Sequence, residues 1–222
     1  MAWSGGKDSA LALWALRDAP DLEVRALLTT VTEQFDRISM HGVRSELLER
    51  QAASLGLPVV RVSIPPDCSN EVYDERMAAA LAQPLIAAVE QYAFGDLFLE
   101  DVRAYREERL RAVGKRCLFP LWGRDTRELA STFIVAGFRG LLTCVDTAGL
   151  DGSFAGRLFD ASLLAELPAS VDPCGEQGEF HTFVFAGPIF RFPIPIETGE
   201  TVVRDGFTFC DVRPADAHVG SS

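Results

Sequence analysis

Near the start of the sequence lies the stretch Ser4-Gly5-Gly6-Lys7-Asp8-Ser9, followed directly by a run rich in alanine and leucine. Two adjacent glycines allow a tight turn and a close approach of the backbone to a ligand. The run over residues 8–17 predicts a helix, and a helix N-terminus presents unpaired N–H groups and partial positive charge. With the added side-chain donors, the stretch predicts an anion site, such as one for phosphate.

The spacing of this stretch is not that of a Walker A loop, G-x-x-x-x-G-K-[ST]. A plain helix N-cap with a surface lysine is the alternative interpretation. The occurrence of all six residues at one helix start favours the anion site.

Expected strands and helices alternate along the first part of the chain. Strands are expected over residues 23–31, 58–64, 92–96 and 140–145; helices are expected over 43–55, 70–82 and 125–136, with a basic helix ending near residue 113. This alternation is typical of βαβ units and a parallel sheet, which binds ligands at the carboxyl ends of its strands.

After about residue 150 the pattern changes to a short helix and strands over 180–185 and 200–212, in a region rich in glycine and proline. We therefore expect an α/β protein: a parallel-sheet nucleotide-binding domain over residues 1–119 and a smaller α+β domain over residues 120–222.

The amino-acid composition disfavours several classes of protein and of binding partner. The chain has 222 residues, is 48% hydrophobic and carries a net charge of −11, so it can bury a core and its surface is acidic. An acidic surface disfavours DNA and anionic membranes as partners. The apolar run over residues 10–16 is far shorter than the roughly 20 residues of a membrane span. The five cysteines show no C-x-x-C spacing, which disfavours a zinc ribbon, a local iron–sulfur motif and a disulfide framework, and indicates reduced thiols in the cytoplasm.

One segment is basic. Residues 101–127 hold eight Lys or Arg and four Asp or Glu, a net charge of +4, so the rest of the chain carries −15. This island indicates either a local anion site or a solvated helix face with Glu/Arg pairs at i,i+4.

A second motif is Asp-Pro-Cys-Gly-Glu-Gln-Gly-Glu-Phe-His-Thr, residues 172–182. On a strand beginning at Phe180, Glu179 and His181 would share one face because side chains alternate with a period of two. Such a pair can transfer protons or hold a metal. The alternative is a glycine-rich hairpin that carries solvated acids.

The first motif resembles the PP-loop of the adenine nucleotide α-hydrolase, or ATP pyrophosphatase, superfamily. The second resembles the signature of the diphthine–ammonia ligase family, which also carries a PP-loop. Residues 40–43, 95–101, 119–122 and 187–188 resemble that family at corresponding places, so the resemblance extends from Trp3 to about Pro193. It implies a Rossmann-like (HUP) nucleotide-binding domain. Superfamily members have a buried strand leading into the loop; here only three residues precede it, so the strand is a stub or the start of the chain is trimmed.

The resemblance implies roles for individual residues. The ATP-binding residues are expected to be Ser4, Gly5, Gly6, Lys7, Asp8, Ser9, Thr29, Thr30, Gly95 and Asp96. The catalytic residues are expected to be Lys7, Asp8, Glu176, Glu179 and His181. Asp8 and Asp96 are the expected ligands of Mg²⁺. The substrate contacts are expected to be His41, Arg103, Arg106 and Lys115, with a structural role as the alternative for His41.

The implied reaction is a two-step amidation. A substrate carboxylate attacks the α-phosphorus of ATP, giving an acyl adenylate and pyrophosphate, and ammonia then displaces AMP. In this family the acceptor is a modified histidine on elongation factor 2; a host without it would need another carboxylate. A homodimer is left open. Three other functions fit the same motifs: a PP-loop enzyme that adenylates a base carbonyl of tRNA, a non-catalytic nucleotide-binding module, and a plain ATP α/β hydrolase.

Overall fold

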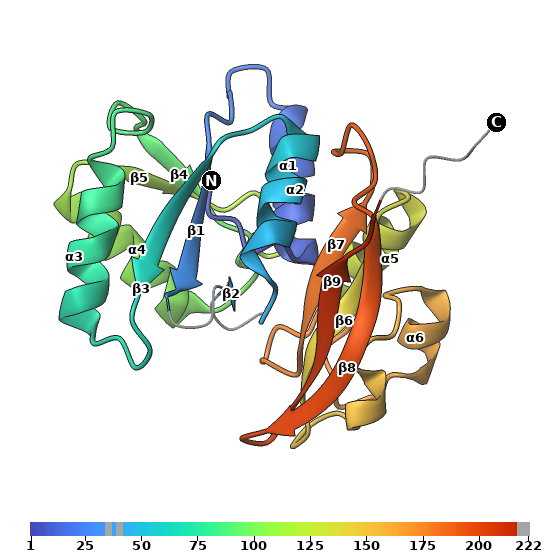
Figure 1. Ribbon diagram of the computed structural model, residues 1–222. Helices are drawn as coiled ribbons and strands as arrows, with labels where there is room; N and C mark the ends of the chain where they lie inside the picture. Colours follow the sequence, from blue (N-terminus) through green and yellow to red (C-terminus); the bar gives the residue numbers. More distant parts are fainter. Residues whose placement is uncertain (34–36, 39–41, 217–222) are drawn as a thin grey trace.

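The computed structural model describes residues 1–33, 37–38 and 42–216. Its first half is built on parallel strands (Figure 1). Strand β1 (Leu27–Thr32) lies beside β3 (Val59–Ile64), and β4 (Gln91–Ala93) lies beside β5 (Arg116–Leu118). The short β2 (Arg37–Ile38) pairs with the end of β1 in the antiparallel direction.

Residues 1–3 join the two strand pairs into one sheet. The Trp3 N–H donates to the Leu28 carbonyl over 2.9 Å, and the Ala2 N–H donates to the Ala93 carbonyl over 2.8 Å. The order across the sheet is therefore β3, β1, residues 1–3, β4 and β5. These three residues take the place of the strand expected before the loop of residues 4–9, which we call the phosphate loop after its expected ligand. The loop therefore begins at the carboxyl edge of the sheet, where α/β proteins bind ligands.

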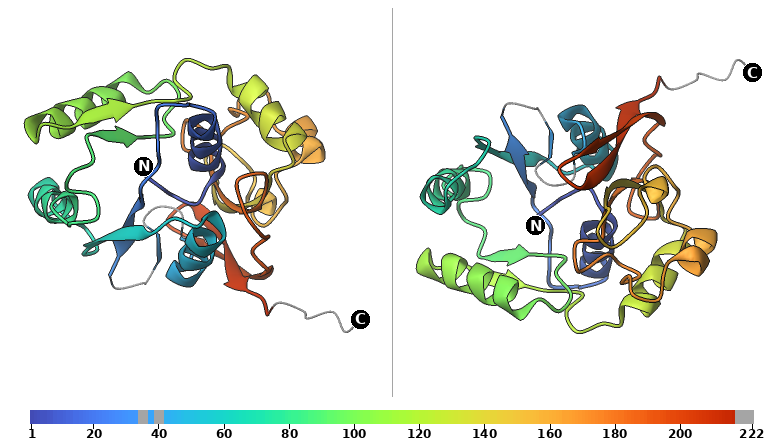
Figure 2. Two further views of the ribbon diagram at one scale, coloured as in Figure 1. Left: turned by 90° about the horizontal axis from the view of Figure 1, so that it is seen from above. Right: turned by 90° about the horizontal axis from the view of Figure 1, so that it is seen from below.

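Two layers of helix enclose this sheet, as the views along its edge show (Figure 2). Helices α1 (Lys7–Arg17) and α2 (Ser45–Leu55) cover one face, and α3 (Asn70–Leu81) and α4 (Glu100–Ala112) cover the other. Helix α1 buries Leu11 and Leu13. Helix α2 ends at Gly56, whose φ of 70° is the left-handed conformation that glycine adopts without strain.

The second half contains an antiparallel sheet in the order β7-β6-β9-β8. Its strands are β6 (Arg139–Asp146), β7 (Phe180–Ala186), β8 (Ile196–Arg204) and β9 (Phe207–Pro214). Helices α5 (Thr126–Val135) and α6 (Ala161–Glu166) and the 3₁₀ turn η1 (Gly152–Phe154) accompany it. Strand β7 reaches back to the phosphate loop, because the Val184 N–H donates to the Gly5 carbonyl over 2.9 Å.

One hydrophobic cluster runs through both halves. Leu11 and Leu47 of the first half belong to the same buried cluster as Phe133 and Phe183 of the second half. A smaller cluster lies under α3 and α4. The domain boundary expected near residue 120 stays a prediction. Among the described residues, no helix combines the length and apolarity that crossing a membrane requires.

The expected α/β class with a parallel sheet and a smaller second unit is confirmed, and the main error concerns residues 200–212. They were expected to form one strand, but the chain turns back within them. Asp205 and Gly206 have φ of 52° and 82°, and they connect β8 to β9 as a hairpin. The Asp-Gly pair is itself a strong hairpin signal, since both positions tolerate positive φ. Strand β5 and the short β2 were not expected, and β1 begins four residues later than expected.

Candidate active site

The two sequence motifs line a single cavity of about 610 Å³. It lies where β1, β4 and residues 1–3 end, so it occupies the carboxyl edge of the parallel sheet. The phosphate loop contributes Ser4, Lys7, Asp8 and Ser9, and the second motif contributes Cys174, Gly175, Glu176, Gly178, Phe180, His181 and Thr182. Residues about 170 positions apart in the chain therefore face the same space.

The phosphate loop adopts its shape through its two glycines. Gly5 has φ of 78°, in the left-handed region. At Gly6, a Cβ atom would lie 3.0 Å from the carbonyl oxygen of Thr182, so a side chain would push β7 away. The Lys7 N–H donates to Thr182 Oγ1 over 3.0 Å, and the Gly6 N–H donates to Ser4 Oγ over 3.3 Å. The loop is thus held against β7, with α1 starting at its end as expected for an anion site.

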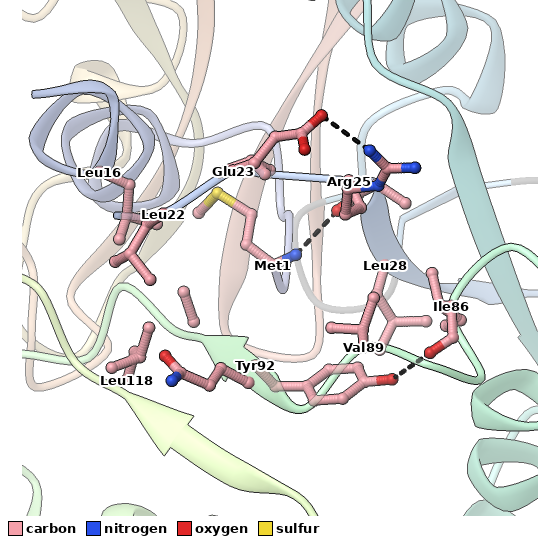
Figure 3. A pocket seen from close by; sticks show the side chains of 14 residues that line it. Met1, Leu16, Leu22, Glu23, Arg25, Leu28, Ile86, Val89, Tyr92 and Leu118 are labelled. Carbon is pink, nitrogen blue, oxygen red and sulfur yellow. Dashed lines mark hydrogen bonds and ion pairs between the residues drawn. The ribbon is translucent and has the colours of Figure 1, made fainter. Parts of the chain in front are cut away.

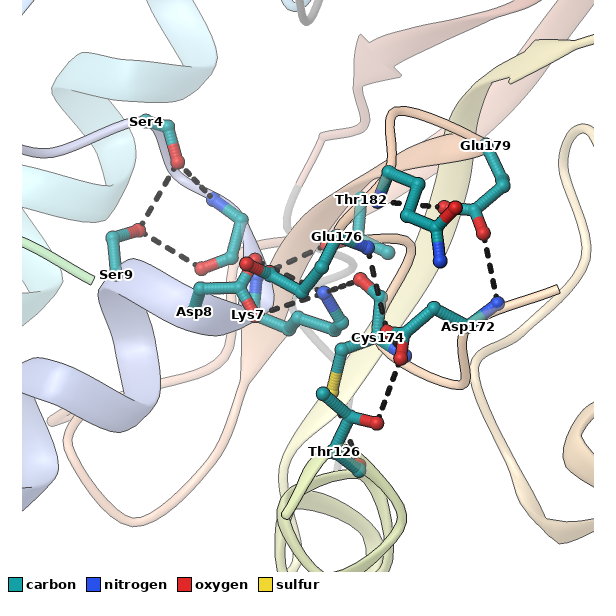
Figure 4. A network of polar contacts seen from close by, with 12 residues as sticks. Ser4, Lys7, Asp8, Ser9, Thr126, Asp172, Cys174, Glu176, Glu179 and Thr182 are labelled. Carbon is teal, nitrogen blue, oxygen red and sulfur yellow. Dashed lines mark hydrogen bonds and ion pairs between the residues drawn. The ribbon is translucent and has the colours of Figure 1, made fainter. Parts of the chain in front are cut away.

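Lys7 is the link between the motifs (Figure 4). Its ammonium lies 2.8 Å from Asp8 Oδ1 and also donates to the carbonyl of Cys174. The residue is only 2% exposed. Burial acts to lower the pKa of Lys7, but the charges of Asp8 and Glu176 outweigh it and raise that pKa above its ordinary value. Lys7 is therefore a fixed positive charge at the point where the motifs meet.

The loop of the second motif is braced by its own acids. The Asp172 carboxylate accepts from the Cys174 N–H over 2.8 Å and from the Thr126 hydroxyl over 2.7 Å. The Glu179 carboxylate accepts from the backbone N–H groups of Asp172 and Gln177 over 2.8 and 2.9 Å. Figure 4 shows these bonds on the side of the loop away from Ser4 and Ser9. Both carboxylates thus fix the loop's shape.

Glu176 faces the cavity from this braced loop, and His181 faces it from β7. Burial, followed by the charge of Asp8, raises the pKa of Glu176 to about 8, although Lys7 opposes the rise. Burial also lowers the pKa of His181, with a smaller contribution from Lys7. At neutral pH the site therefore holds a carboxyl group that exchanges its proton readily and a neutral imidazole, which are suited to proton transfer. Burial raises the pKa of the Cys174 thiol to about 12, so this cysteine is not a ready nucleophile.

The other end of the cavity is more apolar. It is lined by Leu28, Thr30, Ile64, Tyr73 and Phe94. Arg106 closes this end: its Nε lies 2.7 Å from Asp96 Oδ2, and its guanidinium lies 4.4 Å from the centre of the Phe94 ring. A flat aromatic group could lie at this end while an attached anion reached Lys7.

The structure brings most of the predicted site residues together, but not all of them. Ser4, Gly95, Asp96 and Arg106 line the cavity along with the residues already described. Gly95 is also needed for packing, since a Cβ atom there would lie 2.9 Å from the Asp8 carbonyl. His41 lies outside the described residues.

Four predicted residues point elsewhere. The Thr29 hydroxyl donates to the Trp3 carbonyl over 2.7 Å, and the Lys115 ammonium donates to the Ala87 carbonyl over 2.5 Å. Arg103 forms an ion pair with Glu107 and lies 4.6 Å from the centre of the Trp122 ring. Glu179, as described above, bonds to backbone amides. None of the four is among the residues lining the cavity.

Ion pairs also neutralise much of the basic segment. Its pairs are Arg103–Glu107, Arg106–Asp96, Arg109–Asp74, Arg116–Glu90 and Arg124–Glu128. Two of these pairs are the i,i+4 contacts of the alternative interpretation. The segment therefore offers less positive charge to a polyanion than its sequence suggests.

The sequence analysis predicted no role in the site for Asp172, Thr182, Tyr73 or Gln51. Asp172 and Thr182 lie within the second motif, whose density of polar residues was the available signal. Tyr73, from α3, lines the cavity, and its side chain bonds to Thr30. Nothing in the sequence around Tyr73 separates it from an ordinary helix residue.

Two further cavities lie nearby. One of about 310 Å³ lies between α3 and α4 over the sheet and shares Thr30, Tyr73, Phe94 and Arg106 with the main cavity. The other, of about 70 Å³, lies at the amino ends of the strands, where the Met1 ammonium donates to the Ala26 carbonyl and the Tyr92 hydroxyl donates to the Ile86 carbonyl (Figure 3). Its lining includes neither of the two motifs.

The family models that match the two halves of this chain and the relatives that match it all point to one family. The family model of the diphthamide synthase N-terminal domain matches residues 1–117, and that of the diphthamide synthase C-terminal domain matches residues 125–217. A zebrafish (Danio rerio) protein named diphthine–ammonia ligase is 28% identical over 235 residues, covering 94% of this chain and 90% of the relative. A Schizosaccharomyces pombe protein of the same name is 26% identical over 229 residues, covering 95% of this chain but only 38% of the relative. A Rattus norvegicus protein, also of that name, is 29% identical over 117 residues, 49% of this chain and 44% of the relative.

Proposed function

The chain belongs to the diphthamide synthase family, and we propose that it is an ATP-dependent ligase that adenylates a carboxylate and transfers it to ammonia. The observation that carries the proposal is the shared cavity, which is lined both by residues of the glycine-containing loop 4–9 and by Glu176 and His181. Relatives that match most of this chain are named diphthine–ammonia ligase, which supports the same reaction.

In this proposal ATP lies along the cavity. The triphosphate is held by the N-terminus of α1, by Ser4 and Ser9, and by Lys7, which neutralises the charge that develops on the departing pyrophosphate. The apolar end near Thr30 and Tyr73 takes the adenine. Thr29 and Gly95 act indirectly, since each fixes the backbone that shapes the site.

Two carboxylates fit a magnesium ion. Asp8 and Asp96 both line the cavity, where Asp8 pairs with Lys7 and Asp96 pairs with Arg106, so a bound cation would take the place of these partners. The described residues contain no group of three or more His, Cys, Asp or Glu arranged for a metal. Mg²⁺ usually needs only one or two carboxylates when phosphate oxygens supply the rest. We propose that Asp8 and Asp96 hold Mg²⁺ with ATP, where it would offset phosphate charge.

The first chemical step forms one bond and breaks one bond. A carboxylate oxygen of the acceptor attacks the α-phosphorus, and the bond from that phosphorus to the bridging oxygen breaks, releasing pyrophosphate. Arg106, which pairs with Asp96 beside Phe94, keeps its predicted role as a contact for the substrate. The protein's contribution to this step is positioning and electrostatic stabilisation.

In the second step ammonia attacks the carbonyl carbon of the acyl adenylate, and AMP leaves. The attacking nitrogen must lose a proton, and the ionised form of Glu176, which becomes more abundant as the pH approaches 8, accepts it; neutral His181 lines the same cavity from β7. The acceptor that we propose is a carboxylate of the diphthine type, on a histidine of elongation factor 2, presented to the second motif.

The test is to incubate the protein with ATP, Mg²⁺, ammonia and diphthine-bearing elongation factor 2. We expect AMP and pyrophosphate, separated by chromatography, and amidated factor detected by mass spectrometry. ADP and phosphate as the main products would refute the proposal. AMP formed equally without acceptor would indicate a plain hydrolase, and a gel shift with tRNA would favour a tRNA-modifying enzyme.

A further inference from the structure

Gln51 lies in the middle of α2 and is fully buried, with 0% of its surface exposed. A primary amide in such a position is costly unless all its hydrogen-bonding groups find partners. Its partners come from the segment before the phosphate loop, from the loop itself and from β7.

The amide of Gln51 makes three hydrogen bonds. Its Oε1 accepts from the Trp3 indole N–H over 2.9 Å. Its Nε2 donates to the Gly5 carbonyl over 3.0 Å and to the Val184 carbonyl over 2.6 Å. Gly5 approaches so closely that a Cβ atom there would lie 2.7 Å from Gln51 Oε1. The amide therefore joins three segments that are far apart in the sequence.

The Gly5 carbonyl accepts both from Gln51 and from the Val184 N–H of β7, and these two bonds set the orientation of a peptide group in the phosphate loop. Because a trans peptide is planar, its carbonyl and the following N–H point in opposite directions. Turning the Gly5 carbonyl toward Gln51 and β7 therefore turns the Gly6 N–H to the inner side of the loop, where Ser4 Oγ accepts it. This is the side from which backbone N–H groups can meet an anion.

We propose that Gln51 is the positioning residue that holds the phosphate loop in its pyrophosphate-binding form and ties it to the strand that carries His181. The proposal rests on the proposed function, in which this loop binds the phosphates of ATP. Gln51 is not among the residues that line the cavity, so it acts through Gly5 and not on the ligand. Only an uncharged amide can accept one bond and donate two in this arrangement.

The first test compares Gln51→Met, which keeps the bulk and removes the hydrogen bonds, with Ser54→Ala. Ser54 is a matched control because it is also buried on α2 and its hydroxyl bonds to the Phe192 carbonyl of the second half. Calorimetry would measure the affinities for inorganic pyrophosphate and for adenosine separately. We expect Gln51→Met to weaken pyrophosphate binding about tenfold or more, with adenosine binding within about twofold of wild type. Ser54→Ala should leave both affinities unchanged.

Equal pyrophosphate affinity in Gln51→Met and wild type would overturn the proposal, as would an equal loss for adenosine and pyrophosphate. If the wild type itself binds no pyrophosphate, the proposed function fails together with this inference; if only the variant comparison fails, the proposed function stands.

Gln51→Glu provides a second comparison, in which the adenosine affinity separates the proposed role from a merely structural one that would weaken the binding of both ligands. A buried carboxyl group between two carbonyl oxygens is neutral at low pH, when it can donate one hydrogen bond, and repels them when ionised. Relative to wild type at each pH, its pyrophosphate affinity should recover between pH 8 and pH 5, whereas that of Gln51→Met should stay flat. A flat profile for Gln51→Glu would contradict the proposal, as would an adenosine affinity that falls in parallel as the pH rises.

Discussion

Replacing Glu176 with Gln should make the protein more stable at high pH, although we propose Glu176 as the proton acceptor of the reaction. Its pKa is about 8 in the folded protein against an ordinary value of 4.5, with burial as the main cause and the charge of Asp8 next. For an acid with a raised pKa, the unfolded chain loses the proton first. Stability is therefore lost as pH rises from 4.5 to about 8.

The size of the effect follows from that rise. One pKa unit corresponds to about 1.4 kcal/mol, so the penalty grows from near zero at pH 4 to on the order of 3–5 kcal/mol above pH 8. Glutamine has nearly the same shape and no charge to bury. The free energy of unfolding of Glu176→Gln should thus match that of the wild type near pH 4 and exceed it by a few kcal/mol at pH 8.5.

Glu179→Gln is the matched control, three residues along the same loop. The Glu179 carboxylate accepts from two backbone N–H groups, and an amide has only one oxygen to offer them. One N–H group loses its acceptor, which should cost about 1–3 kcal/mol. Two identical substitutions in one motif should therefore change stability in opposite directions at pH 8.5.

The assay is urea denaturation followed by fluorescence at pH 4.5, 6.5 and 8.5. A Glu176→Gln variant that is no more stable than wild type at pH 8.5 would refute the inference that burial and neighbouring charges disfavour the ionised form of Glu176.

The rate of amide formation provides a second measurement. When rates are compared at the same concentration of unprotonated ammonia, the wild-type rate should increase as the pH approaches 8, and the rate of Glu176→Gln should not. An unchanged rise in the variant would remove Glu176 as the proton acceptor.

Other substitutions separate the two chemical steps. Lys7→Ala should slow pyrophosphate release by about 10²–10³-fold, as loss of a preorganised charge does, and near-normal turnover would contradict its role. His181→Ala should keep ATP affinity, measured by calorimetry, close to wild type and reduce amide formation by about 10²-fold or more; equal loss of ATP affinity would instead place His181 in the nucleotide site. Asp96→Asn should raise the Mg²⁺ concentration needed for half-maximal AMP formation, while an unchanged Mg²⁺ dependence would exclude Asp96 as a ligand.

The sequence predicted those features that follow from local pattern. The alternation of strands and helices indicated the parallel sheet, and the Ser4–Ser9 stretch predicted a loop at a helix start, because glycine pairs and helix N-termini have local signatures. The second motif was recognised as one unit for the same reason. The hairpin at Asp205 and Gly206 also had a local signal, the Asp-Gly pair, which the prediction of one strand over residues 200–212 did not take into account.

Other features depend on contacts between distant residues and had no local signal. Glu179 and His181 were expected to act together on one strand face, but Glu179 comes just before β7 and turns back to the amides of Asp172 and Gln177. Glu176, within the turn, reaches the cavity instead. Glu176 and Glu179 point in different directions because the backbone turns between them. The two-residue period of side chains along a strand does not apply within a turn.

The position of Lys7 gives a reason why the two motifs occur together. Its ammonium is shared between Asp8 and the Cys174 carbonyl, and its charge lowers the pKa of Glu176 while Asp8 raises it. An anion bound at Lys7 would offset that positive charge and favour the protonated form of Glu176, whereas Mg²⁺ at Asp8 would offset a negative charge that raises the Glu176 pKa and would favour the carboxylate. The two motifs therefore share one set of charges. The protonation of Glu176 is linked to what binds at Lys7 and Asp8, which a phosphate loop or an acidic loop alone would not achieve.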